Sequence, residues 1–224
     1  GMVVPGVRLQ DFSRVAALES DTLRIALGLH PVFLADHPAD PGEVEAALNG
    51  WLTRLRPVAV GEIGLDYLMP PESFPAQLAL LELQMQLAHR HGLPVILHVR
   101  RAHEPVLALI RRLGFSRGGI VHAFGGSLEQ GREYVKQGFK LGFGGVMTLE
   151  RARRIRQVAV GLSEGALVVE TDAPDLSPAG HWGERNEPAF LSEVVATLAA
   201  LRGVAPERMR EITTANARDL LGWV

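Results

Sequence analysis

Val58-Ala59-Val60-Gly61-Glu62 is a short apolar run that ends in a carboxylate. Three further runs end in other residues of the types that bind divalent metals. They are Pro94-Val95-Ile96-Leu97-His98, Gly119-Ile120-Val121-His122 and Ala166-Leu167-Val168-Val169-Glu170-Thr171-Asp172. In a barrel of parallel strands, the C-terminal ends of all strands lie on one face, and that face carries the active site. The pattern therefore predicts one metal centre built from Glu62, His98, His122 and Asp172.

Seven apolar runs alternate with segments of helical character. Each run is continuous rather than alternating in polarity, as expected of parallel strands buried on both faces. This βαβα order predicts an α/β fold of the TIM (β/α)8-barrel type, in one domain over residues 1–224. The chain begins inside what would be the second strand, so the first strand is absent and seven are expected. They are Met2–Val4, Arg24–Leu29, Val58–Gly61, Val95–Leu97, Gly119–Val121, Phe139–Phe143 and Ala166–Glu170.

Helices are expected in the gaps between these strands. Asp40-Pro41-Gly42-Glu43 has an N-cap residue followed by proline, and opens a helix that runs to Arg56. Ser73 opens a longer helix that Gly92 ends. Other helices are expected from Ser127 to Gly138 and over 150–160, 188–202 and 206–221. The polar segment 173–187, rich in glycine and proline, lies where a barrel places a substrate loop.

Composition narrows the function classes. The formal net charge of −2 leaves no overall basic field, so a nucleic-acid substrate would be held locally by metals and a few arginines. The chain has no cysteine, which removes disulfides and thiol catalysis and fits a cytoplasmic protein. No apolar stretch approaches the roughly 20 residues of a membrane span, so no membrane partner is expected.

Burial cost favours metal binding at the carboxylates of the predicted centre. A carboxylate inside an apolar strand is costly to bury unless it is paired or binds a metal, which favours a ligand role for Glu62. The same argument applies to Asp172, and a carboxylate beside a metal can also accept a proton from water. Asp66 and Glu170 are expected beside the ligands rather than among them.

Four more residues are candidates for binding substrate. His30 precedes Pro31 at a strand end, and the sequence leaves open whether it lines the site or ligates metal. Arg100 follows His98 by two residues, and its planar guanidinium matches phosphate oxygens; the alternative is a surface salt bridge. Arg185 and Asn186, in segment 173–187, are expected to hold the phosphate or its flanking nucleotide. The basic segment 151–156 is interpreted as an exposed helix face.

Several motifs together resemble those of the TatD family, in family order along essentially the whole chain. The resemblance implies a metal-dependent hydrolase barrel of the amidohydrolase type, a deoxyribonuclease that uses magnesium, manganese or zinc. It implies that Glu62 bridges two metals, that His98 and His122 bind one, and that Asp172 binds the other and helps activate water. The motifs are Gly28-Leu29-His30-Pro31, Gly61-Glu62-Ile63-Gly64-Leu65-Asp66-Tyr67, Leu97-His98-Val99-Arg100, Val121-His122-Ala123-Phe124-Gly125-Gly126, Glu170-Thr171-Asp172-Ala173-Pro174, Arg185-Asn186-Glu187-Pro188 and Thr214-Ala215-Asn216-Ala217-Arg218-Asp219-Leu220-Leu221.

One feature departs from the family pattern. The family begins with a strand that ends in a His-x-His pair, which supplies the remaining ligands of the second metal, and no strand predicted here ends in one. We therefore expect one metal on Glu62, His98 and His122, with a second metal weakly held or absent. The sheet edge beside the absent strand is expected to be covered by a neighbouring chain, a rearranged segment or a dimer contact. An N-terminal truncation and a natural short homologue are both open explanations.

The resemblance favours hydrolysis of DNA phosphodiesters through metal-activated water. Two alternatives stay open because a fold does not fix a function. One is another amidohydrolase-type reaction on a lactone, an amide or a small phosphoester. The other is a barrel that binds nucleic acid or a protein partner without turnover.

Overall fold

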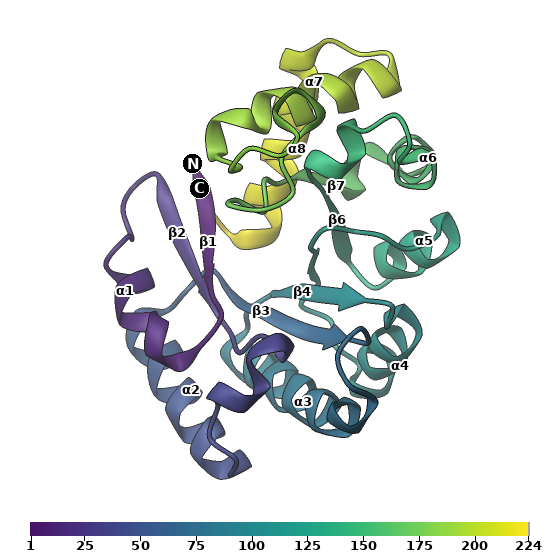
Figure 1. Cartoon of the computed structure of the whole chain (residues 1–224). Helices are drawn as coiled ribbons and strands as arrows, with labels where there is room; N and C mark the ends of the chain where they lie inside the picture. The colour runs from purple at the N-terminus through teal and green to yellow at the C-terminus, as the bar shows by residue number, and fades with distance from the viewer. Residues whose placement is uncertain (224) are drawn as a thin grey trace. The chain divides into compact units, whose positions relative to one another are not determined.

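The computed structural model describes residues 1–223. By their internal contacts these residues form two compact units, unit 1 (Gly1–Gly119) and unit 2 (the part that begins at Ile120). In Figure 1, unit 1 runs from purple to teal and unit 2 from teal to yellow. The single domain expected from the sequence stays a prediction.

Unit 1 is built on four parallel strands that are neighbours both in the sheet and in the sequence. They are β1 (Met2–Gly6), β2 (Leu23–Leu27), β3 (Ala59–Asp66) and β4 (Val95–Arg100). Every residue of β3 is buried, as its continuous apolar run predicts. Strand β3 continues four residues beyond Glu62, because its pairing with β4 extends to Asp66 opposite Arg100. Glu62 therefore lies inside a strand rather than at its end.

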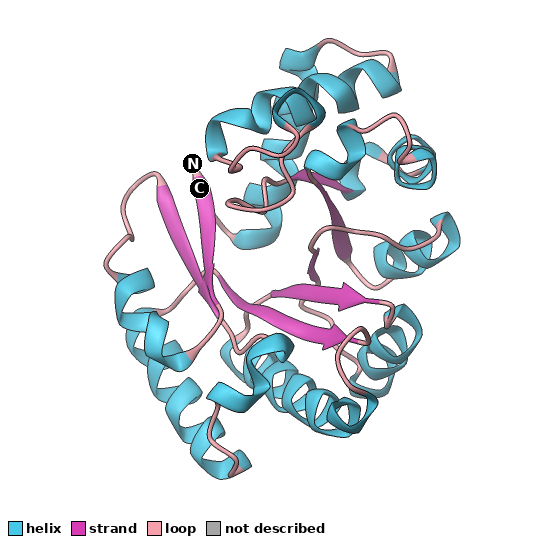
Figure 2. Ribbon diagram, viewed as in Figure 1, coloured by secondary structure: helices cyan, strands magenta, loops and turns pink. Residues whose placement is uncertain are grey.

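Helices α1 (Phe12–Ala16), α2 (Pro41–Leu55), α3 (Phe74–His91) and α4 (His103–Leu113) accompany these strands (Figure 2). The N-cap predicted for α2 is present, since the Asp40 side chain accepts a hydrogen bond from the Gly42 N–H at 2.7 Å. The predicted stop of α3 is also present, with Gly92 in the left-handed region. For α1 and α4 the sequence predicted no bounds beyond a helix in each gap between strands. The Ala102 N-cap of α4 has no capping side chain, and Pro105 lies in its first turn.

Unit 2 contains β6 (Phe139–Phe143) and β7 (Leu167–Val169), which pair in parallel. Strand β5 (Gly119–Val121) begins on the last residue of unit 1. Four helices follow these strands: α5 (Leu128–Lys136), α6 (Arg153–Gly161), α7 (Leu191–Arg202) and α8 (Pro206–Leu221). Ser127 and Gln130 form a reciprocal capping box at the start of α5. The edge-to-face rings of Phe124, Tyr134 and Phe139 form part of the core.

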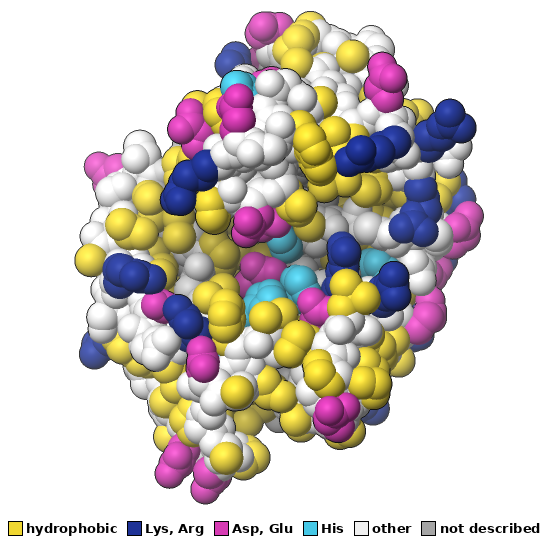
Figure 3. All heavy atoms as spheres, viewed as in Figure 1, with side chains coloured by type: hydrophobic (Ala, Val, Ile, Leu, Met, Phe, Trp, Pro, Cys, Tyr) yellow, Lys and Arg dark blue, Asp and Glu magenta, His cyan; other side chains and the backbone are white. Residues whose placement is uncertain are grey.

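Within the described residues, no single helix is long and apolar enough to cross a membrane. By length and composition alone, the bent pair Pro188–Arg202 and Pro206–Leu221 meets the same criteria, with an angle of 106° between its halves. On the face that Figure 3 shows, Lys and Arg side chains are interspersed with Asp and Glu, which agrees with the near-neutral net charge.

Candidate metal-binding site

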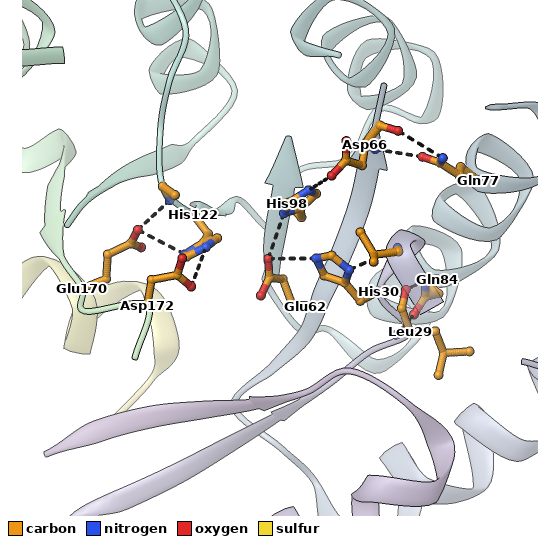
Figure 4. Close-up of polar contacts among 12 residues, drawn as sticks. Leu29, His30, Glu62, Asp66, Gln77, Gln84, His98, His122, Glu170 and Asp172 are labelled. Atoms are coloured by element: carbon orange, nitrogen blue, oxygen red, sulfur yellow. Dashed lines mark hydrogen bonds and ion pairs between the residues drawn. The ribbon is translucent and has the colours of Figure 1, made fainter. Parts of the chain in front are cut away.

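The register of β3 against β4 places His98 between two carboxylates. Glu62, Gly64 and Asp66 are alternate residues of β3, so they share one face of the strand. The ladder sets Gly64 opposite His98. Glu62 Oε1 lies 3.3 Å from His98 Nδ1, and Asp66 Oδ2 lies 3.0 Å from His98 Nε2 (Figure 4). A side chain at position 64 would overlap the His98 carbonyl oxygen, so this close approach requires glycine.

The two carboxylates control the charge of His98. Burial alone would lower the pKa of His98, but hydrogen bonds and charge interactions with Glu62 and Asp66 outweigh it and raise this pKa. Without a metal, the imidazolium form, which donates to both carboxylates, therefore persists to higher pH than in an ordinary histidine. When Nε2–H stays on Asp66 and Nδ1 loses its proton, the Nδ1 lone pair lies beside Glu62.

His30 joins this cluster from the segment that follows β2. Its Nε2 lies 3.4 Å from Glu62 Oε1, and its ring centroid lies 4.4 Å from that of His98. The Val32 N–H donates to His30 Nδ1 at 3.2 Å, so the proton of the neutral ring is on Nε2. In this arrangement His30 presents a donor rather than a lone pair. The geometry thus suits contact with a substrate oxygen, and the substrate role of His30 stays a prediction.

Two buried glutamines of α3 hold the strand ends that carry this cluster. The Gln84 side chain bonds both the N–H and the C=O of Leu29, at 2.7 and 3.0 Å, directly before His30. Gln77 bonds both backbone groups of Asp66, at 2.8 and 3.2 Å. Both side chains are completely buried. Neither glutamine was predicted from the sequence, where the available signal was two glutamines seven residues apart on a helix face that is otherwise buried and apolar.

Unit 2 holds a second cluster of one histidine and two carboxylates. His122 Nδ1 lies 3.1 Å from Glu170 Oε1, and His122 Nε2 lies 3.3 Å from Asp172 Oδ1 (Figure 4). The Ala123 N–H also donates to Glu170 Oε1, at 2.6 Å. Asp172 has a φ of 62°, a left-handed conformation that aspartate tolerates better than most residues and that is common at functional sites. Glu170 thus fixes the His122 ring while Asp172 faces its other nitrogen.

The remaining candidates differ in exposure. Arg100 and Arg185 are exposed. Asn186 is buried, and its amide donates to the Thr171 and Asp175 carbonyl oxygens at 2.7 and 2.6 Å. It therefore fastens segment 173–187 to the residues around Asp172, which does not test its predicted contact with substrate.

The sequence does contain one His-x-His triplet, His89-Arg90-His91, which lies in the last turn of α3. This position differs from the strand end on which the family carries its pair. His91 Nε2 is 2.9 Å from Asn49 Oδ1 on α2, so the triplet takes part in helix packing.

The cluster around His98 fits a divalent metal by its geometry, and the cluster around His122 has donor groups of the same types. In the described part of the chain, ligand atoms of His30, Glu62 and His98 lie within 4.8 Å of one another. Imidazole and carboxylate groups bind Zn²⁺ and Mn²⁺, and carboxylates bind Mg²⁺. A carboxylate on the second nitrogen of a histidine is also typical of metal-ligating histidines, because it fixes the ring and its tautomer. It stays a prediction that one metal centre is formed by Glu62, His98, His122 and Asp172.

Comparison with known proteins identifies one family. The family model described as TatD related DNase matches residues 1–222. The chain is 40% identical over 222 residues to the uncharacterized metal-dependent hydrolase YjjV of Escherichia coli strain K12, covering 98% of this chain and 85% of YjjV. It is 34% identical over 202 residues to the 3'-5' ssDNA/RNA exonuclease TatD of Citrobacter rodentium, covering 87% of this chain and 75% of that protein.

Solved structures agree on the fold. The crystal structure of Escherichia coli YjjV, a TatD homologue, superposes with a TM-score of 0.91 at 38% identity, covering 97% of this chain and 85% of that one. The organophosphorus hydrolase of Deinococcus radiodurans superposes with a TM-score of 0.68 at 14% identity, a likeness of fold alone. The predicted fold class, a seven-stranded chain of the metal-dependent hydrolase barrel type, is confirmed.

Proposed function

The chain belongs to the TatD related DNase family and is a TatD-type metal-dependent hydrolase, and from this premise we propose that it hydrolyses phosphodiester bonds of DNA. The observation that carries the proposal is the shared construction of the two clusters. In each, one histidine nitrogen is fixed by one carboxylate while the other nitrogen faces a second carboxylate. This donor set suits metal-assisted hydrolysis.

In this proposal Glu62, His98, His122 and Asp172 hold the metal and serve one reaction. A bound divalent metal supplies positive charge that polarises the phosphoryl group and acidifies water. Asp172 accepts the proton that the attacking water loses. His30, which presents Nε2–H in the neutral ring, donates to a phosphoryl oxygen.

The two exposed arginines act as phosphate contacts in the same proposal. Arg100 ends β4, and Arg185 lies in the segment that Asn186 fastens near Asp172. A guanidinium matches two phosphate oxygens at once, so each of these residues suits a phosphate of the substrate. The exonuclease named in Citrobacter rodentium supports a nucleic-acid substrate by relationship.

Cleavage of an end-labelled, single-stranded oligodeoxynucleotide tests the proposal. The wild-type chain should cleave with Mn²⁺ and not with excess chelator. Glu62→Gln keeps the side-chain shape and removes the charge, so it should slow cleavage about a hundredfold or more. Glu19→Gln, an exposed carboxylate of unit 1, is the matched control. Wild-type rates in Glu62→Gln would remove Glu62 from the reaction.

A panel of a lactone, an amide and a small phosphoester tests the alternatives. Turnover of one of these without cleavage of DNA would replace the proposal with another hydrolase reaction on the same residues. The identity of the metal, the dimer contact and the cytoplasmic location stay predictions.

A further inference from the structure

An exposed tryptophan paired with an arginine lies outside the two clusters. Trp182 is 54% exposed, and the guanidinium carbon of Arg151 lies 4.9 Å from the centre of its ring. We propose that Trp182 and Arg151 form a platform for single-stranded nucleic acid, with a nucleobase stacked on the indole and a phosphate on the guanidinium. This inference deepens the proposed function, on which it rests, by assigning a contact for the strand beyond the scissile bond.

The two loops that carry the platform follow the C-terminal ends of β6 and β7, and Glu170 and Asp172 come directly after β7. Arg151 belongs to the loop after β6, and Trp182 to the loop after β7, and these strands are parallel neighbours (Figure 1). Parallel strands end on the same edge of their sheet. The Ala179 N–H donates to Thr148 Oγ1 at 2.7 Å, which joins the two loops. A single strand of nucleic acid bound at Asp172 could therefore continue over these two loops.

The backbone that carries Trp182 is held firmly. His181 Nδ1 and Nε2 each lie 2.9 Å from a carboxylate, on Glu184 and Glu193 respectively. The His181 ring stacks on Phe190, with centroids 3.6 Å apart and planes 5° from parallel. The residue directly before Trp182 is therefore fixed by two ion pairs and a ring stack, and a side chain presented from a backbone held in this way loses less freedom when a ligand binds it.

The chemistry of the platform favours single-stranded over double-stranded nucleic acid. Aromatic side chains bind nucleobases by stacking on their faces, and these faces are open only where a base is unstacked from a duplex. Arg151 adds a charge that attracts phosphate, and Arg153 and Arg154 are exposed beside it in the sequence. An acidic peptide would satisfy the arginines but would leave the indole face without a planar partner.

Binding of a fluorescent, phosphorothioate-linked oligothymidylate to the full chain with Mg²⁺ tests the platform, since this linkage resists cleavage. Trp182→Ala should weaken binding by about tenfold or more, while Trp182→Phe keeps a ring and should retain most of the affinity. Arg151→Gln should lower the slope of log affinity against log salt by about 0.7, the value for one phosphate contact on a single strand.

The matched controls are Leu68→Ala, an exposed apolar residue of unit 1, and Arg132→Gln, an exposed arginine of α5. Equal affinities for Trp182→Ala, Leu68→Ala and the wild type would overturn the platform, as would tighter binding of duplex than of single strand. Undetectable binding by the wild type would overturn it as well. Hydrolysis of bis(4-nitrophenyl) phosphate by the wild type tests the proposed function separately, because so small a diester does not need the platform.

Discussion

At His98 and His122 one arrangement recurs with the two ring nitrogens exchanged. Asp66 bonds Nε2 of His98, so Nδ1 faces Glu62, whereas Glu170 bonds Nδ1 of His122, so Nε2 faces Asp172. In each ring the orienting carboxylate decides which nitrogen keeps its proton. Asp66 and Glu170 are therefore positioning residues for the two histidines.

Neutralising these positioning carboxylates should weaken metal binding while leaving the proposed ligands in place. Asp66→Asn and Glu170→Gln should each lower the affinity for Mn²⁺ or Zn²⁺ by about 10–100-fold, because the amides no longer fix the ring tautomers. Titration calorimetry measures the affinity, with the exposed Asp175→Asn as control. Unchanged affinity in both variants would show that the histidines do not depend on these carboxylates.

Gly142 of β6 provides the space that Glu170 occupies. A Cβ at this position would overlap Glu170 Oε2 and lie 2.7 Å from its carboxyl carbon. Gly142→Ala should therefore displace Glu170, destabilise the chain by about 1–3 kcal/mol and weaken metal binding at His122. Urea unfolding and calorimetry measure the two effects. Gly165→Ala, where a Cβ would meet nothing within 4 Å, should change neither; equal effects in the two variants would contradict the role of Gly142.

Among the elements, α3 links packing to function through its two buried glutamines. Each glutamine bonds both the N–H and the C=O of one residue, Gln84 at Leu29 beyond β2 and Gln77 at Asp66 at the end of β3. Buried backbone groups need such partners. The same helix thereby fixes the residue before His30 and the residue that orients His98.

Removing one of these glutamines should cost stability and loosen the cluster. Gln84→Leu keeps a similar volume but leaves the Leu29 N–H and C=O without partners, at about 1–3 kcal/mol for each group. The measurement is urea unfolding together with amide hydrogen exchange at Leu29, which should become faster. Gln86→Leu, an exposed position on the same helix, should leave both unchanged. Slow exchange at Leu29 in Gln84→Leu would show that another group replaces the glutamine.

Over the whole molecule, an apolar run predicted the bounds of a strand correctly where the hydrogen-bonded pairing with the neighbouring strand stops at the end of that run. The bounds of β5, β6 and α8 are those expected, because glycine, proline and polar residues flank them closely. Strand β3 is longer than expected because Glu62 and Gly64 interrupt its apolar run, while the ladder to β4 continues beyond them. The bonds of Gln77 and Gln84 were not predictable, since both glutamines reach residues distant in sequence. Glu62 and His98 were predicted from their residue type. Which nitrogen of His98 faces Glu62 and which faces Asp66 depends on the register of β3 against β4, which the sequence does not show.

The dependence of unfolding free energy on pH combines opposite contributions from two histidines. Burial lowers the pKa of His37, against weaker raising effects of the His30 carbonyl and Asp36. The unfolded chain then binds more protons than the native chain below about pH 6.5, so this contribution to stability is lost as the pH falls through the native pKa. The raised pKa of His98 acts in the other direction, and its contribution is lost as the pH rises through the native value.

In chelator, which keeps metal from replacing the proton on His98, stability from these two groups should therefore be greatest near about pH 6.5. His37→Gln should remove the loss on the acid side and leave the loss on the alkaline side. Urea unfolding between about pH 5 and about pH 8 measures both slopes. His89→Gln, an exposed histidine of α3, is the control. If the acid-side slope of His37→Gln equals that of the wild type, His37 is not the group that resists protonation, and the acid sensitivity belongs elsewhere in the chain.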